Sequence, residues 1–325
     1  MSQDIYVVIE HLRGQVMDIS YVMLTAARVL AQGTGGKVVA VFLDHDANGI
    51  TTDFAADETL YIDHPLLADF TSDTYYQTLA DLLSDKRPRA VLLGDTSIGA
   101  DVAGGLSMRL GAPLVSRCHS VSAENGVLKF VSQICGGKIM VEGDLPDPMV
   151  LITMVPGGYK PEQGRSEQAP ELTSAPAPML EKGTRVALKQ YIEPEAGDVD
   201  IAKERVLIAV GRGIQREDNI ELAEELAEAL GGVVCGSRPV VDQGWLPTTR
   251  LIGKSGKAVK PTVYLALGIS GAPEHVEGMS GSENIIAINT DPTAPIFNVA
   301  KYGAEVDLLD LLPVLTERVQ QIKGG

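Results

Sequence analysis

Short apolar runs rich in β-branched residues alternate with longer amphipathic stretches along the first half of the chain. Apolar runs of this kind, separated by helical stretches, are typical of parallel strands that are buried on both faces. We therefore expect an α/β fold with doubly wound, mostly parallel sheets. The expected strands are residues 5–9, 38–43, 90–93 and 115–121, and the expected helices are residues 18–31, 74–83 and 99–110.

The length of 325 residues suits two α/β domains and is too long for one ordinary domain. Residues 156–178 are rich in Pro, Gly, Glu, Gln and Ser, which predicts an exposed excursion, and residues 186–192 are expected to return as a strand of the first domain. Pro, Gly and acidic residues in the next stretch favour a hinge. We predict an N-terminal domain over 1–195, a hinge over 196–203 and a second domain over 204–325.

The second domain begins with the apolar run 205–210, which ends at Gly211. A helix is expected next, with Asp218 as its N-cap, Glu221 completing a capping box and Gly231 as its terminator. Ligands of doubly wound sheets bind outside the carboxyl ends of the strands. The loops after these strands are therefore the expected binding site, and further strands are expected at residues 263–267 and 285–288.

Composition excludes several classes of function. The formal net charge of -16 opposes general nucleic-acid binding, because a phosphate backbone would be repelled at long range. No apolar run reaches the roughly 20 residues needed to cross a bilayer, and the N-terminus lacks a signal-peptide pattern, so we expect a cytoplasmic protein without membrane insertion. The cysteines lie far apart and no histidine stands at ligand spacing, so neither a disulfide framework nor a metal site is expected. No pair of residues suggests an acid–base catalyst.

Two loops of small residues flank one apolar strand of the second domain. Gly253-Lys254-Ser255-Gly256 precedes the strand, and Gly268 to His275 follow it. Glycines let backbone N–H groups approach a ligand closely, and Ser, Lys and His add donors that suit an oxyanion or a carbonyl-rich ring. The set suits a dinucleotide, but neither GxGxxG nor GxxxxGK[ST] is present. An NAD- or other nucleotide-binding enzyme that uses the same loops is the alternative.

Five motifs in this half of the chain resemble, in wording, order and spacing, the alpha subunit of electron transfer flavoproteins. They are Gly211-Arg212-Gly213, Ser237-Arg238-Pro239, Gly253-Lys254-Ser255-Gly256-Lys257, Gly268-Ile269-Ser270-Gly271-Ala272 and Ala287-Ile288-Asn289-Thr290-Asp291-Pro292. The N-terminal half matches more weakly, at Glu10-His11-Leu12-Arg13-Gly14, Asp95-Thr96-Ser97-Ile98-Gly99 and Gly136-Gly137.

The resemblance implies that the second domain holds FAD. It places Arg238, Ser255 and His275 on the isoalloxazine ring, where a guanidinium, a hydroxyl and an imidazole would favour added negative charge. The residues implied to bind FAD are Arg212, Ser237, Arg238, Ile252, Gly253, Lys254, Ser255, Gly256, Ser270, Gly271, Ala272, Pro273, Glu274, His275, Asn289, Asp307 and Leu308.

The resemblance also implies an electron carrier rather than a stand-alone enzyme. Such a chain forms a heterodimer with a beta subunit, here expected to pack mainly on residues 1–195 and to carry AMP or a second FAD. It accepts electrons from dehydrogenases and passes them to a quinone reductase or another acceptor. Some family members take part in electron bifurcation, which stays an open alternative. So does a flavin-free scaffold, for which altered residues at the site would be the support.

The chain departs from the family pattern at the expected site. Lys254 stands where the family usually has Gln, and Pro273-Glu274 stand where it usually has Ile or Val followed by Gln. A lysine close to the flavin should raise its potential, while Glu274 could pair with Lys254 and cancel that effect. We therefore expect a retuned flavin. In the first domain, Ala100 stands where the family commonly has Arg, and residues 132–135 replace an Arg-Pro-x-aromatic stretch.

Overall fold

The chain folds into two compact α/β units, Met1–Tyr191 and Ile192–Gly325. Within the part of the chain described below, no helix is long and apolar enough to cross a membrane. Residues 136–137, which belong to one of the weaker motifs, and residues 196–198 of the predicted hinge lie outside that part. The computed structural model describes residues 2–47, 53–124, 126–135, 139–177, 180, 186–191 and 199–324.

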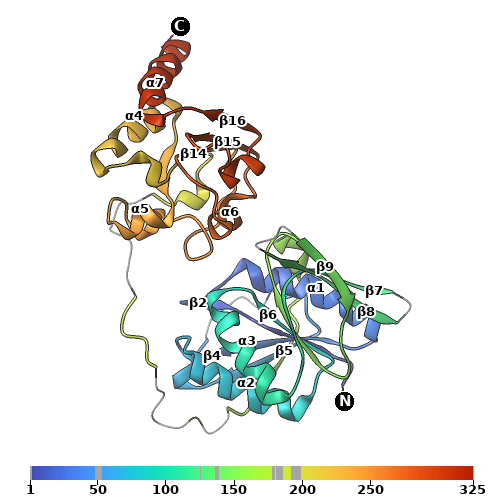
Figure 1. Cartoon of the computed structure of the whole chain (residues 1–325). Coiled ribbons are helices and arrows are strands. Elements are labelled where there is room, and N and C mark those ends of the chain that lie inside the picture. The colour runs from blue at the N-terminus through green and yellow to red at the C-terminus, as the bar shows by residue number, and fades with distance from the viewer. Residues whose placement is uncertain are drawn as a thin grey trace. The chain divides into compact units, whose positions relative to one another are not determined.

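The first unit is built on a mixed, mostly parallel sheet (Figure 1). Its strand order is β11-β5-β4-β1-β6-β10-β7-β8-β9. Neighbouring strands are parallel from β11 to β7, and β8 and β9 extend the sheet in antiparallel fashion. The strands are β1 (Ile5–Val8), β4 (Val38–Asp44), β5 (Glu58–Asp63), β6 (Ala90–Gly94), β7 (Leu114–Glu124), β8 (Val127–Ile134), β9 (Ile139–Asp144), β10 (Val150–Met154) and β11 (Glu171–Ala175). A small antiparallel ribbon pairs β2 (His11–Leu12) with β3 (Gln15–Val16).

Helices cover both faces of this sheet, as the continuous apolar strands predict. Successive side chains of a strand point to opposite faces, so Ile5 and Val7 pack in the core that contains α1, whereas Tyr6 and Val8 pack in the core that contains α2 and α3. The predicted doubly wound fold of this half is therefore confirmed. The helices are α1 (Asp18–Thr34), α2 (Ser72–Lys86) and α3 (Ser97–Leu110), and a short 3-10 helix, η1, spans Pro65–Leu67.

One edge of this sheet was predicted wrongly. Residues 186–191 contain no strand, whereas β11 forms inside the supposed excursion and pairs with β5. An edge strand has one neighbour and one exposed side, so it tolerates the polar sequence Glu-Leu-Thr-Ser-Ala that we assigned to an exposed loop. The structure of β11 therefore depends on the edge that β5 offers and not on its own apolar content.

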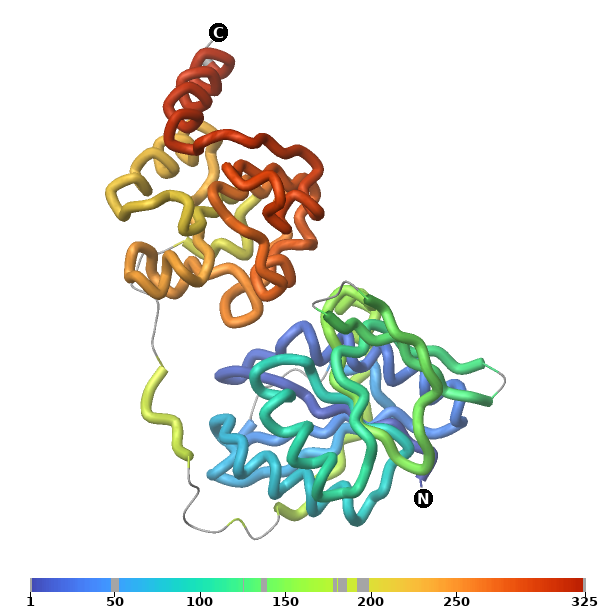
Figure 2. The backbone as a smooth tube through the Cα atoms, in the orientation of Figure 1, coloured from blue at the N-terminus to red at the C-terminus, as the bar shows by residue number. Residues whose placement is uncertain are grey.

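The second unit contains a five-stranded parallel sheet of order β13-β12-β14-β15-β16. Helices α4 and α7 pack in the core on one face, and α6 packs in the core on the other. Figure 2 follows this backbone from yellow to red along the chain. The elements are β12 (Val206–Val210), α4 (Ile220–Leu230), β13 (Val233–Gly236), α5 (Arg238–Asp242), β14 (Val263–Leu267), α6 (Pro273–Met279), β15 (Asn284–Asn289), β16 (Tyr302–Glu305) and α7 (Leu308–Gly324), with 3-10 helices at Ile201–Lys203, Arg212–Ile214, Glu217–Asn219, Thr248–Arg250 and Pro295–Asn298.

Helix α4 begins differently from the prediction. Asp218 lies inside a 3-10 turn, Glu217–Asn219, that leads into the helix, and the N-cap position belongs to Asn219. The Asn219 side chain does not cap the helix but donates to the Ile214 carbonyl at 2.8 Å. The predicted cap and capping box are therefore wrong. The 3-10 turn already includes Asp218, so this residue does not occupy the position before the first helical residue, Ile220. The predicted stop is confirmed, since Gly231 has a left-handed φ of 69°.

Candidate functional site

Five loops of the second unit meet at the carboxyl edge of its parallel sheet. The strand order places β13 on one side of β12 and β14 on the other, so the chain reverses its direction of winding between β12 and β14. Doubly wound sheets bind ligands at this switch point. In Figure 1, α5 and α6, which follow β13 and β14, lie at the end of the unit opposite the free end of α7. The sheet therefore brings the loops identified from the sequence to one edge.

The loops after β12 and β14 cross with almost no space between their backbones. Gly213 donates to the Gly268 carbonyl at 3.1 Å, and Gly211 donates to Leu267 at 2.8 Å. A Cβ atom on Gly268 would lie 2.6 Å from Gly213 Cα, and Gly268 has a φ of 63°. A side chain at this crossing is excluded by both contact and backbone conformation. The glycines are therefore needed to hold the two loops together.

The loop of residues 253–257 is a compact turn that lies against α6. The backbone N–H of Lys254 donates to the Glu274 carbonyl at 2.8 Å, and Lys257 N–H closes the loop on the Leu251 carbonyl at 2.8 Å. Gly253 has a φ of 130°, a conformation that favours glycine, and a Cβ there would lie 2.9 Å from the Glu274 carbonyl oxygen. Loop and helix are thus fixed to each other by backbone contacts.

Arg238 and Ser255 meet across two of these loops. The Arg238 Nη1 atom donates to Ser255 Oγ at 3.2 Å, and its Nε atom donates to Asp242 Oδ2 at 3.3 Å. Both Arg238 and Ser255 are exposed. The guanidinium keeps further N–H donors, because a guanidinium has five in a planar fork. The structure therefore places a positive charge and a hydroxyl side by side on the open side of the loops.

The loop after β14 offers backbone donors. Among the described residues, no hydrogen bond uses the N–H groups of Ser270, Gly271 and Ala272. The loop itself is held in place, because the Ser270 carbonyl accepts from Ile296 N–H at 3.0 Å and Asn289 Nδ2 donates to the Ile269 carbonyl at 2.9 Å. Three successive unbonded donors in a fixed loop suit the oxygens of a phosphate group.

His275 is at the site but points inward. It is buried, and its Nε2 atom lies 2.8 Å from the hydroxyl of Tyr264, a fully buried residue of β14. Its Nδ1 atom is also buried, and the nearby Ile252 backbone is the other polar group that acts on the ring. Burial lowers the pKa of His275 to about 4, and hydrogen bonding to the Ile252 backbone opposes this effect only in part. The imidazole is therefore neutral at ordinary pH.

The remaining predicted residues take mixed positions. Arg212 is exposed at the end of β12, whereas Ser237 is buried and its backbone N–H donates to the Val210 carbonyl at 3.0 Å. Asp307 accepts from Leu309 N–H at 2.9 Å and so caps the start of α7, while Leu308 is buried beneath it. The structural role of Asp307 is therefore to cap α7.

Lys254 and Glu274 are neighbours through their backbones but not through their side chains. Both side chains are exposed, and no ion pair joins them within the described residues. The carboxylate therefore does not neutralise the lysine in this structure. Lys254 therefore keeps its positive charge at an exposed position next to Ser255 in the chain.

The loops fit a dinucleotide such as FAD on two structural observations. The unbonded amides of residues 270–272 suit the pyrophosphate, and the pair of Arg238 and Ser255 suits an electron-rich ring. In addition, a Cβ on Gly271 would lie 2.3 Å from Ile296 N, so the donor loop cannot carry a bulkier residue there. The donor set is that of an anion and a carbonyl-rich ring, not of a metal.

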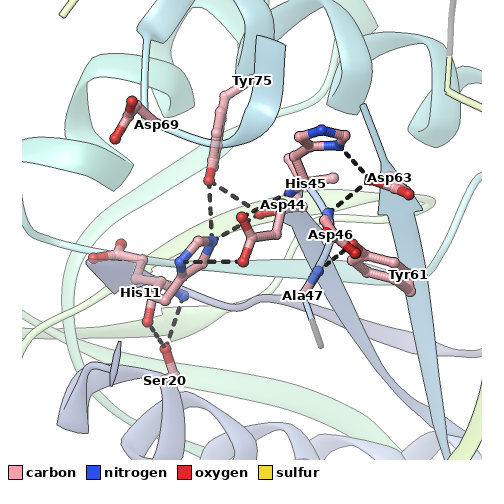
Figure 3. Close-up of polar contacts among 12 residues, drawn as sticks. His11, Ser20, Asp44, His45, Asp46, Ala47, Tyr61, Asp63, Asp69 and Tyr75 are labelled. Carbon is pink, nitrogen blue, oxygen red and sulfur yellow. Dashed lines mark hydrogen bonds and ion pairs between the residues drawn. The ribbon is translucent and has the colours of Figure 1, made fainter. Parts of the chain in front are cut away.

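The first unit holds a second polar cluster, at the carboxyl ends of β1 and β4 (Figure 3). His11 Nε2 lies 2.8 Å from the Leu43 carbonyl, and Tyr75 Oη donates to the same carbonyl at 3.2 Å. His45 Nδ1 lies 3.0 Å from Asp63 Oδ1 (Figure 3). Among the described residues, no group of three or more His, Cys, Asp or Glu side chains has the arrangement of a metal site. These histidines join neighbouring strand ends to one another.

Glu10 is the most deeply buried acid of this region. Its carboxylate accepts from Gly94 N–H at 3.1 Å and from Thr96 Oγ1 at 2.8 Å, next to the start of α3. Burial nevertheless raises the pKa of Glu10 to about 7, because desolvation outweighs these two hydrogen bonds. The group that fills the switch point between β1 and β6 is therefore a side chain of the protein itself.

Sequence reasoning missed three residues that support the cofactor loops: Tyr264, Lys257 and Asp200. Tyr264 lies in an apolar strand and looks like an ordinary core aromatic, and nothing in the sequence pairs it with His275. Lys257 is the last residue of the Gly253–Lys257 motif, and its own sequence context gives it no further role. Its Nζ atom donates to Asp200 Oδ1 at 2.7 Å, across a sequence separation that leaves no local signal. Only the tertiary structure brings these partners together.

Comparison with protein families covers both units. Residues 5–180 match the family described as the Electron transfer flavoprotein domain, and residues 200–280 match the family described as the Electron transfer flavoprotein FAD-binding domain. The second match contains the loops after β12, β13 and β14, and with them Arg238, Ser255 and the unbonded amides.

Full-length relatives show the same similarity. The chain is 34% identical to the electron transfer flavoprotein subunit alpha of Thermoanaerobacterium thermosaccharolyticum, over 99% of both chains. It is 34% identical to the protein FixB of Clostridium saccharobutylicum, over 98% of this chain and 96% of that one. It is 32% identical to the acryloyl-CoA reductase electron transfer subunit beta of Anaerotignum propionicum, over 99% of this chain and 97% of that one.

Proposed function

The chain belongs to the electron transfer flavoprotein family, as an FAD-binding alpha subunit, and from this premise we propose which residues hold the flavin and which partners it serves. Bound FAD supplies the ability to take up and release electrons one or two at a time. The observation that carries the proposal is the contact of Arg238 with Ser255, which sets a cation and a hydroxyl together on the open side of the loops. The ring is proposed to lie against this pair.

In this proposal, side chains and backbone N–H groups of the protein stabilise negative charge on the cofactor. Arg238 and Ser255 act on the ring, and His275 is a third proposed contact, which rests on the family resemblance and on its position at the start of α6. The backbone N–H groups of residues 270–272 bind the pyrophosphate, with Arg212 nearby on the neighbouring loop. The remaining predicted residues, from Ser237 to Leu308, are proposed to fix the shape of the site. They do so through backbone hydrogen bonds in the loops and through the cap that Asp307 provides for α7.

We propose that a beta subunit covers the antiparallel end of the first unit. Strand β9 is an edge strand of the described sheet, and Ile139, Met140 and Val141 on it are 49%, 48% and 37% exposed. An unpaired edge with exposed apolar side chains is typical of a protein interface, because a monomer would be prone to aggregation there. The proposed interface lies on the N-terminal domain, in keeping with the expectation that beta packs mainly on residues 1–195.

The proposed redox partners are a dehydrogenase as donor and a quinone reductase or another protein as acceptor. One relative is named as an electron transfer subunit of acryloyl-CoA reductase, and this name supports a flavin-dependent dehydrogenase or reductase of that general kind as a partner. Electron bifurcation is a finer version of the same proposal. It requires a second FAD, proposed for beta, where a simple carrier holds AMP.

The first experiment is an absorption spectrum of the chain purified with its beta subunit, followed by release and quantitation of FAD and AMP. One FAD per heterodimer, with AMP, supports a simple carrier, and two FAD support a bifurcating complex. No flavin, even after FAD is added, would refute the assignment.

Arg238→Gln should lower the flavin midpoint potential by ~59 mV for a one-electron couple. This shift corresponds to the loss of about 1.4 kcal/mol of interaction between the guanidinium and the reduced ring. Arg205→Gln is the matched control, because Arg205 precedes β12 and so lies at the amino end of the strands, away from the cofactor loops at their carboxyl end.

The proposed interface has its own test. Met140→Glu should abolish co-purification of beta, because it places a charge on the apolar edge of β9. Leu172→Glu is the matched control, since Leu172 is also exposed but lies on β11, at the other edge of the same sheet. Retention of beta by the Met140 variant, or loss of beta from both variants, would contradict the assignment of the interface to β9.

A further inference from the structure

An ion pair ties the start of the FAD-binding unit to its cofactor loop. Lys257 Nζ donates to Asp200 Oδ1 at 2.7 Å. The two side chains are 36% and 44% exposed. The hydrogen bond from Lys257 is also the main reason why the pKa of Asp200 lies below its usual value. The contact joins two segments that are far apart in the sequence but belong to the same unit.

Lys257 is the residue that closes the cofactor loop. Its carbonyl accepts from Gly253 N–H at 3.3 Å, its N–H donates to Leu251 at 2.8 Å, and it forms a bridge with Ile252. Ser255, the proposed flavin contact, lies inside this closed loop. The position of the Lys257 side chain is therefore coupled, through three backbone contacts, to the position of the Ser255 hydroxyl.

Asp200 belongs to a segment that is itself anchored. It begins the 3-10 turn Ile201–Lys203, where its side chain accepts from Ala202 N–H at 3.3 Å. Ile201 is fully buried in the core that also contains Ile252 and Tyr264. We call residues 200–203 the lead-in turn, because they form the last part of the predicted hinge before β12. One end of the ion pair is thus fixed to the core, and the other is fixed to the loop.

We propose that Asp200 is a positioning residue for the cofactor loop, so that FAD binding and attachment of the lead-in turn stabilise each other. The inference rests on the proposed role of the 253–257 loop in holding FAD. Coupling of two events is reciprocal: if the attached turn favours the loop that binds FAD, bound FAD must favour the attached turn by the same free energy. The end of the predicted hinge is then held more firmly when the flavin is present.

The size of the effect follows from the exposure of the pair. Ion pairs near the surface change an equilibrium constant by up to about fivefold, and we expect a twofold to fivefold change for this half-exposed pair. Lys203 provides an internal comparison. Its Nζ atom lies 3.4 Å from the other oxygen of Asp200, but its side chain is 83% exposed and it does not belong to the loop. Removal of its charge should leave FAD binding unchanged.

The test titrates FAD into the deflavinated complex of the full chain with beta. Asp200→Asn and Lys257→Met should each raise the dissociation constant of FAD about twofold to fivefold, the double variant no further, and the exchanged pair Asp200→Lys with Lys257→Asp should recover most of the loss. The effect should fade at high salt. Lys203→Met is the matched control. Equal effects of Lys203→Met and Lys257→Met, or additive effects of the two single changes, would overturn the inference.

A second readout is amide hydrogen exchange, and its first comparison does not need the cofactor. In FAD-free protein, Asp200→Asn should accelerate amide hydrogen exchange in residues 253–257, and Lys257→Met should accelerate it in the lead-in turn. In the unaltered protein, added FAD should slow exchange in the lead-in turn. If the unaltered protein binds no FAD, the proposed function fails, and the first comparison still decides the role of the ion pair. If it binds FAD but neither substitution changes the rate of amide hydrogen exchange in either segment, only this inference fails.

Discussion

Replacement of Glu10 by glutamine should remove a large part of the pH dependence of the stability of the first unit. Glu10 is 2% exposed and has a folded-state pKa of about 7, compared with an ordinary value of 4.5. The carboxyl group therefore holds its proton in the folded protein at pH values where the unfolded chain has lost it. Its contribution to stability is fully present below pH 4.5 and is lost as the pH rises through about 7.

The magnitude follows from the difference between the two values. Each pKa unit corresponds to 1.36 kcal/mol, so a difference of about 2.5 units makes the first unit about 3 kcal/mol less stable above pH 8 than below pH 4.5, as far as this group is concerned. Glutamine has the same shape and does not titrate. The free energy of unfolding of Glu10→Gln relative to the unaltered protein should therefore rise by about 3 kcal/mol across this range.

The assay is urea unfolding of the complete chain at several pH values, followed by circular dichroism. Trp245 is the single tryptophan and lies in the second unit, so its fluorescence identifies the transition that does not belong to Glu10. Glu171→Gln, at an exposed position of β11, controls for the loss of one negative charge. Parallel pH curves for Glu10→Gln and the unaltered protein would refute the argument that desolvation outweighs the hydrogen bonds from Gly94 and Thr96.

Three further predictions concern the second unit. His275 has a folded-state pKa of about 4, compared with an ordinary value of 6.5, so its contribution to stability is present above pH 6.5 and lost as the pH falls through 4; His275→Gln should remove about 3 kcal/mol of acid destabilisation in urea unfolding followed by Trp245 fluorescence. Gly268→Ala should destabilise the unit by more than about 2 kcal/mol and prevent FAD binding, because the added Cβ meets Gly213 and φ is positive; a variant with normal thermal stability and flavin content would contradict this. Lys254→Gln should lower the flavin midpoint potential by roughly 20–40 mV for a one-electron couple, the equivalent of a surface charge contribution on the order of 0.5–1 kcal/mol; unchanged potentials in a redox titration would show that the charge does not act on the ring.

Much of the fold followed from periodicity. The apolar runs of both halves became central parallel strands, because a strand covered on both faces must be apolar throughout. The prediction failed at the edge of the sheet, and it also lacked the fully buried strand β10. Strand β11 is polar, and its sequence predicts a loop. Val186 and Leu188 are apolar and predict part of a strand, but both are exposed in the structure. Edge positions are decided by the neighbour that is available, and composition says little about that.

The site divides in the same way. Glycines such as Gly211, Gly253 and Gly268 could be recognised from the sequence, because close backbone approach and positive φ restrict a position to one residue type. The contact of Arg238 with Ser255 was expected only as two separate ligands of one ring. The inward orientation of His275 toward Tyr264 was not expected, because any amphipathic pattern is compatible with several side-chain partners.

The sequence by itself determined the α/β class and several central strands with the helices between them, and it singled out the loops at which we expect a nucleotide-sized ligand to bind, because these depend on local periodicity and on residue types with few alternatives. Only the tertiary structure decided which distant residues meet. The pairs Asp200 with Lys257, Tyr264 with His275 and Glu10 with the start of α3 are joined by the crossing of strands and loops. Their consequences for charge and burial arise from three-dimensional proximity, for which a linear pattern carries no signal.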